Sequence, residues 1–181
     1  ARLSALDILA QGLTQMPDNA FPRAEVALEG ALEAALRDHS ALEVEDQFRH
    51  QLRQSRGLDA AAGRTLEGPH RSDLQVSHLA KSMPASACST GEQKALLVGL
   101  ILAQARSVAA RLGDVPILLL DEVAAHLDAH RRAALADILS DLGGQSWITG
   151  TDMESFAAFG ANVSHVDFAG LTATTSEASR I

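Results

Sequence analysis

Two adjacent carboxylates, Asp121 and Glu122, directly follow the apolar run at 116–120. A carboxylate at the C-terminal end of a buried parallel strand lies where α/β sheets bind ligands. Asp121 is therefore a candidate direct or outer-sphere ligand of nucleotide-bound Mg²⁺, which is held by one or two carboxylates beside phosphates and water. Glu122 is the candidate base that polarises a water for in-line attack on a γ-phosphate. The alternative is that the pair only ends a strand at a solvated turn.

A second stretch with possible chemistry is Ser-Thr-Gly-Glu-Gln at 89–93, which opens a long apolar segment. It is predicted to begin a helix, whose exposed N–H groups and positive dipole end suit a polyphosphate. Ser89 adds a hydroxyl, and Gly91 permits close approach of a backbone. Ser89 and Glu92 also fit an ordinary capping box, and the two interpretations are compatible.

The pair Leu127-Asp128 is predicted to begin the next helix, with Asp128 as its N-cap. Because it follows the acidic pair, we also expect Asp128 to act at a nucleotide-dependent interface. No Gly-x-x-x-x-Gly-Lys-Ser/Thr phosphate loop occurs in the 181 residues. These features together indicate the second half of the nucleotide-binding domain of an ABC-type ATPase, and so the C-terminal part of a larger protein.

The pattern of apolar residues predicts the elements that position these groups. Helical spacing indicates helices over residues 3–13, 24–37 and 44–57, the last ending at Gly57. Sustained heptads are absent, which favours a compact helical lobe over a coiled-coil arm. We expect three regions: a helical lobe at 1–63, the C-terminal part of an ABC-type ATPase domain at 64–170, and a flexible tail at 171–181.

The region after residue 63 is predicted to be α/β. The helix expected at 91–111 is apolar nearly all round, which implies a buried position. The continuous apolar run at 115–120 is typical of a parallel strand covered on both faces. The other expected elements are a strand at 74–77, a helix at 128–142 ended by Gly143-Gly144, a strand at 146–149, a short helix at 152–159 and a strand at 162–168. This alternation predicts a parallel sheet with crossover helices.

Composition narrows the class of protein. The net charge of −8 argues against a wholly basic nucleic-acid coat but permits a local basic patch. The single cysteine, Cys88, has no internal partner, which favours the reducing cytoplasm, and no nearby cluster to activate it. The longest apolar run, at 95–103, is too short to span a bilayer. The seven histidines and the cysteine show no metal-ligand spacing.

Four motifs now make a resemblance specific. The segments at 67–73, 89–97, 118–128 and 149–152 resemble the RecF family of bacterial DNA replication and repair proteins, and the similarity covers essentially the whole chain as that family's C-terminal half. The second and third are shared with ABC-type and SMC-like ATPases, whereas Gly-Pro-His-Arg at 68–71 and Thr-Gly-Thr-Asp at 149–152 are more specific to RecF. The family usually has Asp-Asp after the arginine, where this chain has Ser72-Asp73.

The resemblance implies a function in DNA repair, recombination, replication and the SOS response. It implies a protein that binds ATP and Mg²⁺, dimerises around two nucleotides, binds DNA at gaps or junctions, and loads RecA with RecO and RecR partners. Asp121 and Glu122 would serve the subunit's own phosphate loop. The residues that would reach the partner's γ-phosphate are Ser89, Thr90, Gly91, Glu92 and Gln93. Asp128 would belong to the D-loop, and Thr149 and Thr151 would occupy the switch region where transporters carry a histidine.

Several alternatives stay open. His70 and Arg71 are either functional residues or only part of a rigid connection. Arg49, Arg53 and Arg56 share a helix face that binds DNA phosphates or, the favoured interpretation, pairs with acids such as Glu45. Another SMC-like or transporter ATPase half is disfavoured by the missing heptads and switch histidine. A non-catalytic interaction module is the alternative from another class. Because it lacks the phosphate loop, the 181-residue chain alone is expected not to hydrolyse ATP.

Overall fold

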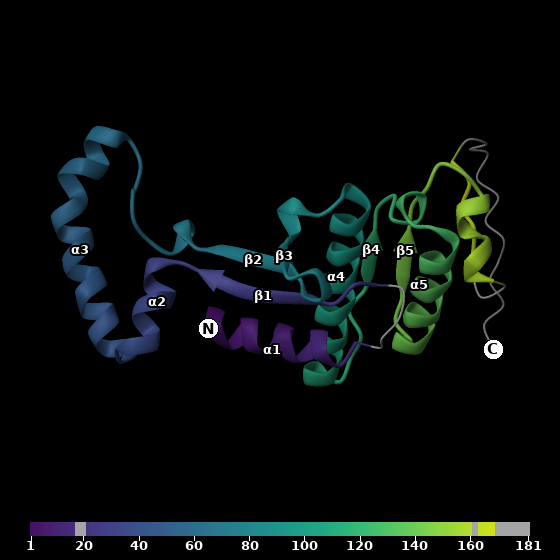
Figure 1. Ribbon diagram of the computed structural model, residues 1–181, viewed down its shortest axis with the longest axis horizontal. Helices are drawn as coiled ribbons and strands as arrows, with labels where there is room; N and C mark the ends of the chain where they lie inside the picture. Colours follow the sequence, from purple (N-terminus) through teal and green to yellow (C-terminus); the bar gives the residue numbers. More distant parts are fainter. Residues whose placement is uncertain (17–20, 161–162, 169–181) are drawn as a thin grey trace.

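The computed structural model describes residues 1–16, 21–160 and 163–168. It is a mixed α/β fold, mostly helical with two small sheets, and the molecule is elongated (Figure 1). The tail predicted to be flexible, 171–181, lies outside the described residues. The elements are α1 (Arg2–Thr14), β1 (Ala24–Glu29), α2 (Ala31–Asp38), α3 (Ala41–Ala62), η1 (Pro69–Arg71), β2 (Asp73–His78), η2 (Leu79–Lys81), β3 (Met83–Pro84), η3 (Ala85–Ala87), α4 (Thr90–Leu112), β4 (Leu118–Leu120), η4 (Ala124–His126), α5 (Ala129–Leu142), β5 (Ser146–Ile148) and η5 (Glu154–Phe159).

Strand β1 lies where the apolar pattern predicted the first part of a helix over 24–37. Every second residue, beginning at Ala24, is buried or half-buried, while the residues between are exposed. This is the period of a strand, and β1 pairs antiparallel with β2 along its whole length. The helix prediction is therefore wrong for 24–29, because pairing with a distant strand outweighs local propensity. It is confirmed for the part that forms α2.

Helices α2 and α3 stand at one end of the molecule, beyond the β1–β2 ladder (Figure 1). Helix α3 begins at a capping box formed by Ser40 and Glu43, and only its Val44 is buried. It does not stop at Gly57 as predicted; it continues to Ala62 and ends at Gly63. The boundary predicted at residue 63 stays a prediction, and β1 and β2 pair across it.

Helix α4 lies at the centre of the hydrophobic core. Leu96 and Leu102 are fully buried, together with Leu135 of α5. Helix α1 crosses α4 so closely that a Cβ on Gly12 would lie 2.4 Å from Ser107 Oγ, which favours glycine there. Among the described residues, α4 alone is long and apolar enough to cross a membrane, but the core helix of a soluble protein passes the same test.

The second sheet pairs β4 and β5 in parallel, as the sequence predicted. The continuous apolar run was expected to be covered on both faces, and this is wrong within the described chain. Leu118 and Leu120 are buried, whereas Leu119 between them is 77% exposed and its cross-strand neighbour Trp147 is 54% exposed. Within the described residues, the hydrophobic core therefore covers only one face of this sheet.

The last predicted elements are partly confirmed. Helix α5 begins after Asp128 and ends at Gly143, whose left-handed conformation (φ 72°) suits glycine. The short helix expected at 152–159 appears as the 3₁₀ helix η5. The strand predicted over 162–168 does not form over 163–168, and Asn162 lies outside the described residues. Within the described part of the chain the parallel sheet therefore has two strands.

Candidate functional site

The predicted acidic pair lies at the carboxyl ends of two neighbouring parallel strands. The Thr149 amide extends the ladder by donating to the Leu120 carbonyl oxygen at 3.1 Å. The Thr149 hydroxyl donates to Asp121 Oδ1 at 2.5 Å and accepts from the Glu122 amide at 2.9 Å. One hydroxyl after β5 thus holds both acidic residues after β4. Sequence reasoning placed Thr149 nearby but did not foresee this bridge.

Glu122 has an unusual backbone. Its φ of 51° lies in the left-handed region, which costs a non-glycine residue on the order of 1–2 kcal/mol. The hydrogen bond from its amide to Thr149 helps to hold that conformation. Strained residues of this kind cluster at functional sites. The side chain is exposed, and within the described residues its carboxylate accepts no hydrogen bond, so it is available to a water or a ligand.

Asp128 is confirmed as the N-cap of α5. Its Oδ1 accepts from the Arg131 amide at 2.8 Å, and this hydrogen bond is the main cause that lowers the pKa of the Asp128 carboxyl. Thr151 is exposed and makes no hydrogen bond within the described residues, in contrast to Thr149. The D-loop and switch roles of these residues stay predictions.

The loop before α4 is a complete capping box. The Glu92 amide donates to Ser89 Oγ at 3.4 Å, while the Ser89 amide and hydroxyl donate to Glu92 Oε2 at 3.1 and 2.9 Å. Gln93 donates back to the Cys88 carbonyl oxygen at 3.0 Å, so it braces the loop. A Cβ on Gly91 would meet no atom within 4 Å, so the surrounding protein does not require glycine there.

Lys81 is the residue that sequence reasoning missed. Its ammonium pairs with Glu92 Oε1, and this hydrogen bond, followed by that from Ser89, lowers the pKa of Glu92 to about 2. The same contact raises the pKa of Lys81. The chain has only one other lysine, at position 94, so rarity was the signal that could have drawn attention to it.

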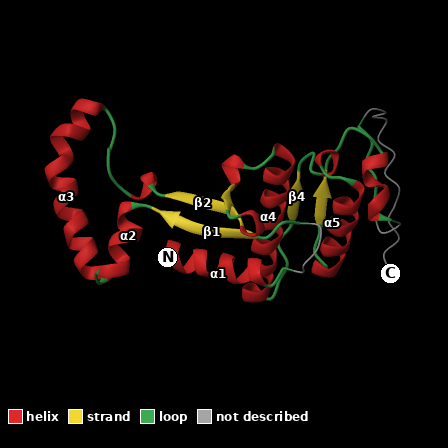
Figure 2. Cartoon of the chain, viewed as in Figure 1, coloured by secondary structure: helices red, strands yellow, loops and turns green. Residues whose placement is uncertain are grey.

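The 89–93 loop and the acidic pair Asp121–Glu122 lie on the same side of the molecule. Helix α4 begins, and both parallel strands end, toward the upper side in Figure 2. Among the described residues, no hydrogen bond or ion pair joins the 89–93 loop to Asp121 or Glu122. They are therefore two separate polar groups that can face a common ligand or partner surface.

Comparison with known proteins now decides the relationship. No protein-family model matches the chain. "DNA replication and repair protein RecF" of Brucella abortus (strain 2308) is 57% identical over 159 residues, covering 87% of this chain and 41% of that relative. The RecF of Mesorhizobium japonicum is 53% identical over 159 residues, covering 87% and 42%. This chain is a RecF homologue. It spans about two fifths of the length of the curated relatives it matches.

Solved structures agree on the fold. A RecF-ATPrS structure, described as the recombination mediator protein in the RecFOR pathway, matches with a TM-score of 0.60 and 24% identity, covering 85% of this chain and 40% of that one. The corresponding RecF-ATP structure has a TM-score of 0.59 at the same identity, covering 83% and 39%. The described fold is thus similar to part of RecF.

The resemblance to RecF implies a bound Mg²⁺–nucleotide. The residues of this chain fit such a ligand only if other groups complete the site. Asp121 Oδ1 is held by Thr149, which leaves Oδ2 for a cation or its water. No group of three or more His, Cys, Asp or Glu side chains able to hold a metal occurs in the described residues. Asp121 would be the one protein carboxylate that holds a magnesium ion there, with phosphates and water as the other ligands.

The RecF-type Gly-Pro-His-Arg motif lies far from these groups, at the base of the α2–α3 arm. His70 Nε2 forms a hydrogen bond with the Thr65 carbonyl oxygen at 3.0 Å, which supports the interpretation as a structural connection. Gly68 has a φ of 145°, a conformation that favours glycine. The next residue, Ser72, donates to the buried Glu33 Oε2 at 2.7 Å, and an Arg2 guanidinium lies 3.6 Å from the other oxygen. The Ser72 hydroxyl is the main cause that lowers the pKa of Glu33.

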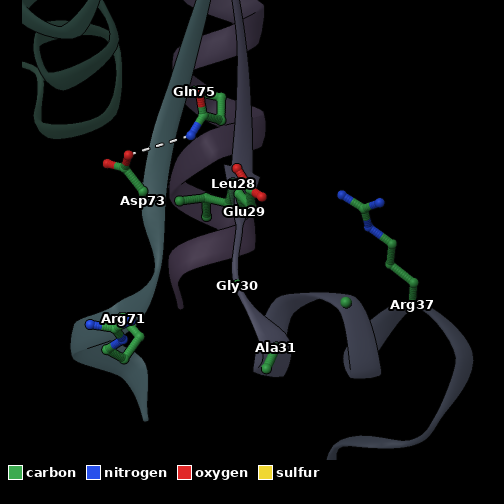
Figure 3. A pocket seen from close by; sticks show the side chains of 9 residues that line it. Leu28, Glu29, Gly30, Ala31, Arg37, Arg71, Asp73 and Gln75 are labelled. Carbon is green, nitrogen blue, oxygen red and sulfur yellow. Dashed lines mark hydrogen bonds between the residues drawn. The ribbon is translucent and has the colours of Figure 1, made fainter. Parts of the chain in front are cut away.

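A cavity of about 690 Å³ opens beside this junction (Figure 3). Arg37 and Arg71 lie on opposite sides of it, and Gln75 is bonded to Asp73 at its rim. The lining residues are Leu28, Glu29, Gly30, Ala31, Ala34, Arg37, Arg71, Asp73 and Gln75. The cavity contains none of the predicted nucleotide residues and carries acids as well as arginines.

The arginine face of α3 is divided. Arg49 pairs with Glu45 at 2.6 Å, as the favoured interpretation predicted. Arg53 and Arg56 form no ion pair within the described residues. The salt-bridged interpretation is therefore confirmed for the first arginine, and the other two guanidinium groups stay available.

Proposed function

We propose that this chain is the C-terminal part of the ATPase lobe of a RecF-type protein. In that protein it would bind ATP with Mg²⁺, dimerise around two nucleotides, and act in the cytoplasm on DNA, with RecO and RecR partners, to load RecA at gaps. The observation that carries the proposal is the Thr149 bridge between Asp121 and Glu122 at the ends of two parallel strands in a RecF homologue.

The exposed sheet face supports the ATPase-lobe assignment. Leu119 and Trp147 lie side by side on two parallel strands, which are normally covered on both faces. A two-stranded sheet is marginal by itself, and within the described residues its outer edges pair with no further strand. We infer that further strands and helices of the longer protein complete this sheet and supply the glycine-rich phosphate loop.

The proposed roles follow from chemistry at each position. Mg²⁺ would neutralise charge on the phosphates and hold their geometry. Asp121 would bind the cation or its water through the oxygen that Thr149 leaves free. Glu122 would accept the proton of the attacking water, and its exposed carboxylate supports this role. Ser89, at the start of α4, would donate to the γ-phosphate held by a second subunit, aided by the helix dipole.

The chain alone is expected not to turn over ATP, since it lacks the loop lysine and glycine-rich loop that hold the β- and γ-phosphates. Phosphate release with Mg²⁺ at micromolar protein measures this. Turnover abolished by Glu122→Gln would show instead that the 181 residues contain a complete site.

A mixing experiment in the full-length protein tests the subunit arrangement. Ser89→Arg puts a bulky cation where a small donor must approach ATP, so it should block ATP-dependent dimerisation and hydrolysis but leave monomeric ATP binding intact. This variant is combined with one changed at the phosphate-loop lysine. If Ser89 acts in trans, mixed dimers hold one intact site and activity returns. If mixing restores nothing, Ser89 is only a helix cap.

A further inference from the structure

Two helices in the described part of the chain, α3 and α4, begin with capping boxes of nearly the same geometry. At α3, the Ser40 amide and hydroxyl donate to Glu43 Oε2 at 2.9 and 2.8 Å, and the Glu43 amide donates to Ser40 Oγ at 3.3 Å. At α4 the corresponding distances for Ser89 and Glu92 are 3.1, 2.9 and 3.4 Å. The α3 box therefore shows which contacts suffice for a capping box to begin a helix in this protein.

One contact distinguishes the boxes. Glu92 carries a lysine partner on its second oxygen, whereas Glu43 has no ion-pair partner among the described residues. Lys81 comes from outside the helix, 11 residues earlier in the chain. Since the α3 box forms without a cation, starting the helix does not explain why Lys81 is there.

The charge of Glu92 gives a reason. A carboxylate at the start of α4 repels any polyphosphate that approaches the helix N-terminus and cancels part of the positive dipole end. Protonation cannot remove this charge near neutral pH, because the pKa of Glu92 is about 2. The Lys81 ammonium, in direct contact, can offset it.

The hydroxyl of Ser89 adds a second reason. It now donates to Glu92 Oε2, so it must turn away to donate to a phosphate. Glu92 would then keep the Ser89 amide and the Lys81 ammonium as donors. With Lys81 in place, the carboxylate stays paired after the hydroxyl leaves, which lowers the penalty for that turn.

We propose that Lys81 is a positioning residue that neutralises Glu92 and frees the Ser89 hydroxyl for the triphosphate of ATP held by a second subunit. This inference rests on the proposed function, and it assigns to the loop a residue outside the Ser-x-Gly-x-Gln motif. Lys81 acts through Glu92 and Ser89 and need not touch the nucleotide.

The test measures ATP-dependent dimerisation of the full-length protein by sedimentation, with Glu122→Gln present in every sample to stop hydrolysis. Lys81→Met should weaken the ATP-dependent dimer by about tenfold, since it leaves one uncompensated charge beside a polyanion. ATP binding to the monomer should not change. Lys81→Arg should dimerise like the parent because it keeps the charge.

The deciding sample is the double variant Lys81→Met/Glu92→Gln. Glutamine keeps a capping box but carries no charge, so dimerisation should recover to near the level of Glu92→Gln alone. The matched control Glu43→Gln, at the other box, should leave dimerisation unchanged. A merely structural tether between η2 and α4 predicts no such rescue, because the double variant lacks both partners.

Each other outcome is decisive. If the parent dimerises with ATP and Lys81→Met does so equally well, the inference about Lys81 is overturned and the proposed function stands. If Lys81→Met weakens the dimer and the double variant does not recover, charge neutralisation is wrong. If the parent forms no ATP-dependent dimer, the proposed function fails, and this inference fails with it.

Discussion

The loop at 89–93 and the strand end at 121–122 are built in opposite ways. The partners of the loop lie close in sequence: Glu92 bonds Ser89 three residues away and Lys81 11 residues away. The strand-end residues are held by Thr149, which lies 27 and 28 residues further along the chain. The loop can form as soon as its helix forms, whereas the strand end exists only when two strands pair.

The backbone conformations of the loop and the strand end also differ. Ser89 has an ordinary extended conformation with φ −63°, whereas Glu122 is left-handed with φ 51°. The loop is therefore relaxed and stabilises its helix, while the strand end is strained and depends on the fold around it. Among substitutions that keep the size of the side chain, those at the strand end should harm activity most, and those at the loop should be milder and visible in titration.

Of these size-conserving substitutions, Glu122→Gln in the full-length protein should have the largest effect. Loss of a general base typically costs about 10²–10⁴-fold in rate. ATP binding should survive, since glutamine keeps the size of the side chain and the strand end, so nucleotide-bound dimers should accumulate. Steady-state phosphate release and sedimentation with ATP measure the two effects. Hydrolysis at the parent rate would exclude Glu122 as the base.

An intermediate effect is expected for Thr149→Val, which keeps the shape but removes the bridging hydroxyl. Asp121 loses a donor and the Glu122 amide loses its acceptor, so both carboxylates become less well placed. We expect a fall in kcat of roughly tenfold with little change in ATP affinity. Thr149→Ser keeps the hydroxyl and should restore most of the rate. Equal rates for valine and serine would show that the bridge has no part in catalysis.

The smallest effect concerns pH. The pKa of Glu92 is lowered from 4.5 to about 2, chiefly by Lys81. A carboxyl with a lowered folded-state pKa stabilises the fold above pH 4.5, and this contribution disappears as pH falls from 4.5 toward 2. Carboxyl NMR titration should find Glu92 below Glu43, whose pKa is lowered mainly by Ser40 without a lysine. Lys81→Met should raise the pKa of Glu92 toward that of Glu43. Coincident titrations of the two residues in the parent would contradict this.

Local signals explain which parts of the site the sequence could predict. The caps at Ser89 and Asp128 were predictable because their partners lie within three residues. The position of Asp121 and Glu122 followed from an apolar run with an abrupt acidic end. The Thr149 bridge and the Lys81 ion pair were not predictable, since each depends on how separate segments approach one another in space.

The same distinction applies to the fold. The start of α4 and both bounds of α5 followed from caps and glycine stops. Strand β1 was mistaken for a helix because its apolar residues fit both periods, and only its partner β2, about fifty residues later, decides between them. Leu119 was expected to be buried because a continuous apolar run predicts a strand covered on both faces. The run does not show whether the segment that covers the second face belongs to these 181 residues, and Leu119 is exposed here.

The half-exposed Trp147 has a spectroscopic consequence. It is the only tryptophan of the chain, which has no tyrosine, so near-ultraviolet emission comes almost entirely from one position on β5. An indole in contact with water emits at longer wavelength than one in an apolar environment. The wavelength of maximum emission therefore shows, without any label, whether the exposed face of the β4–β5 sheet is covered.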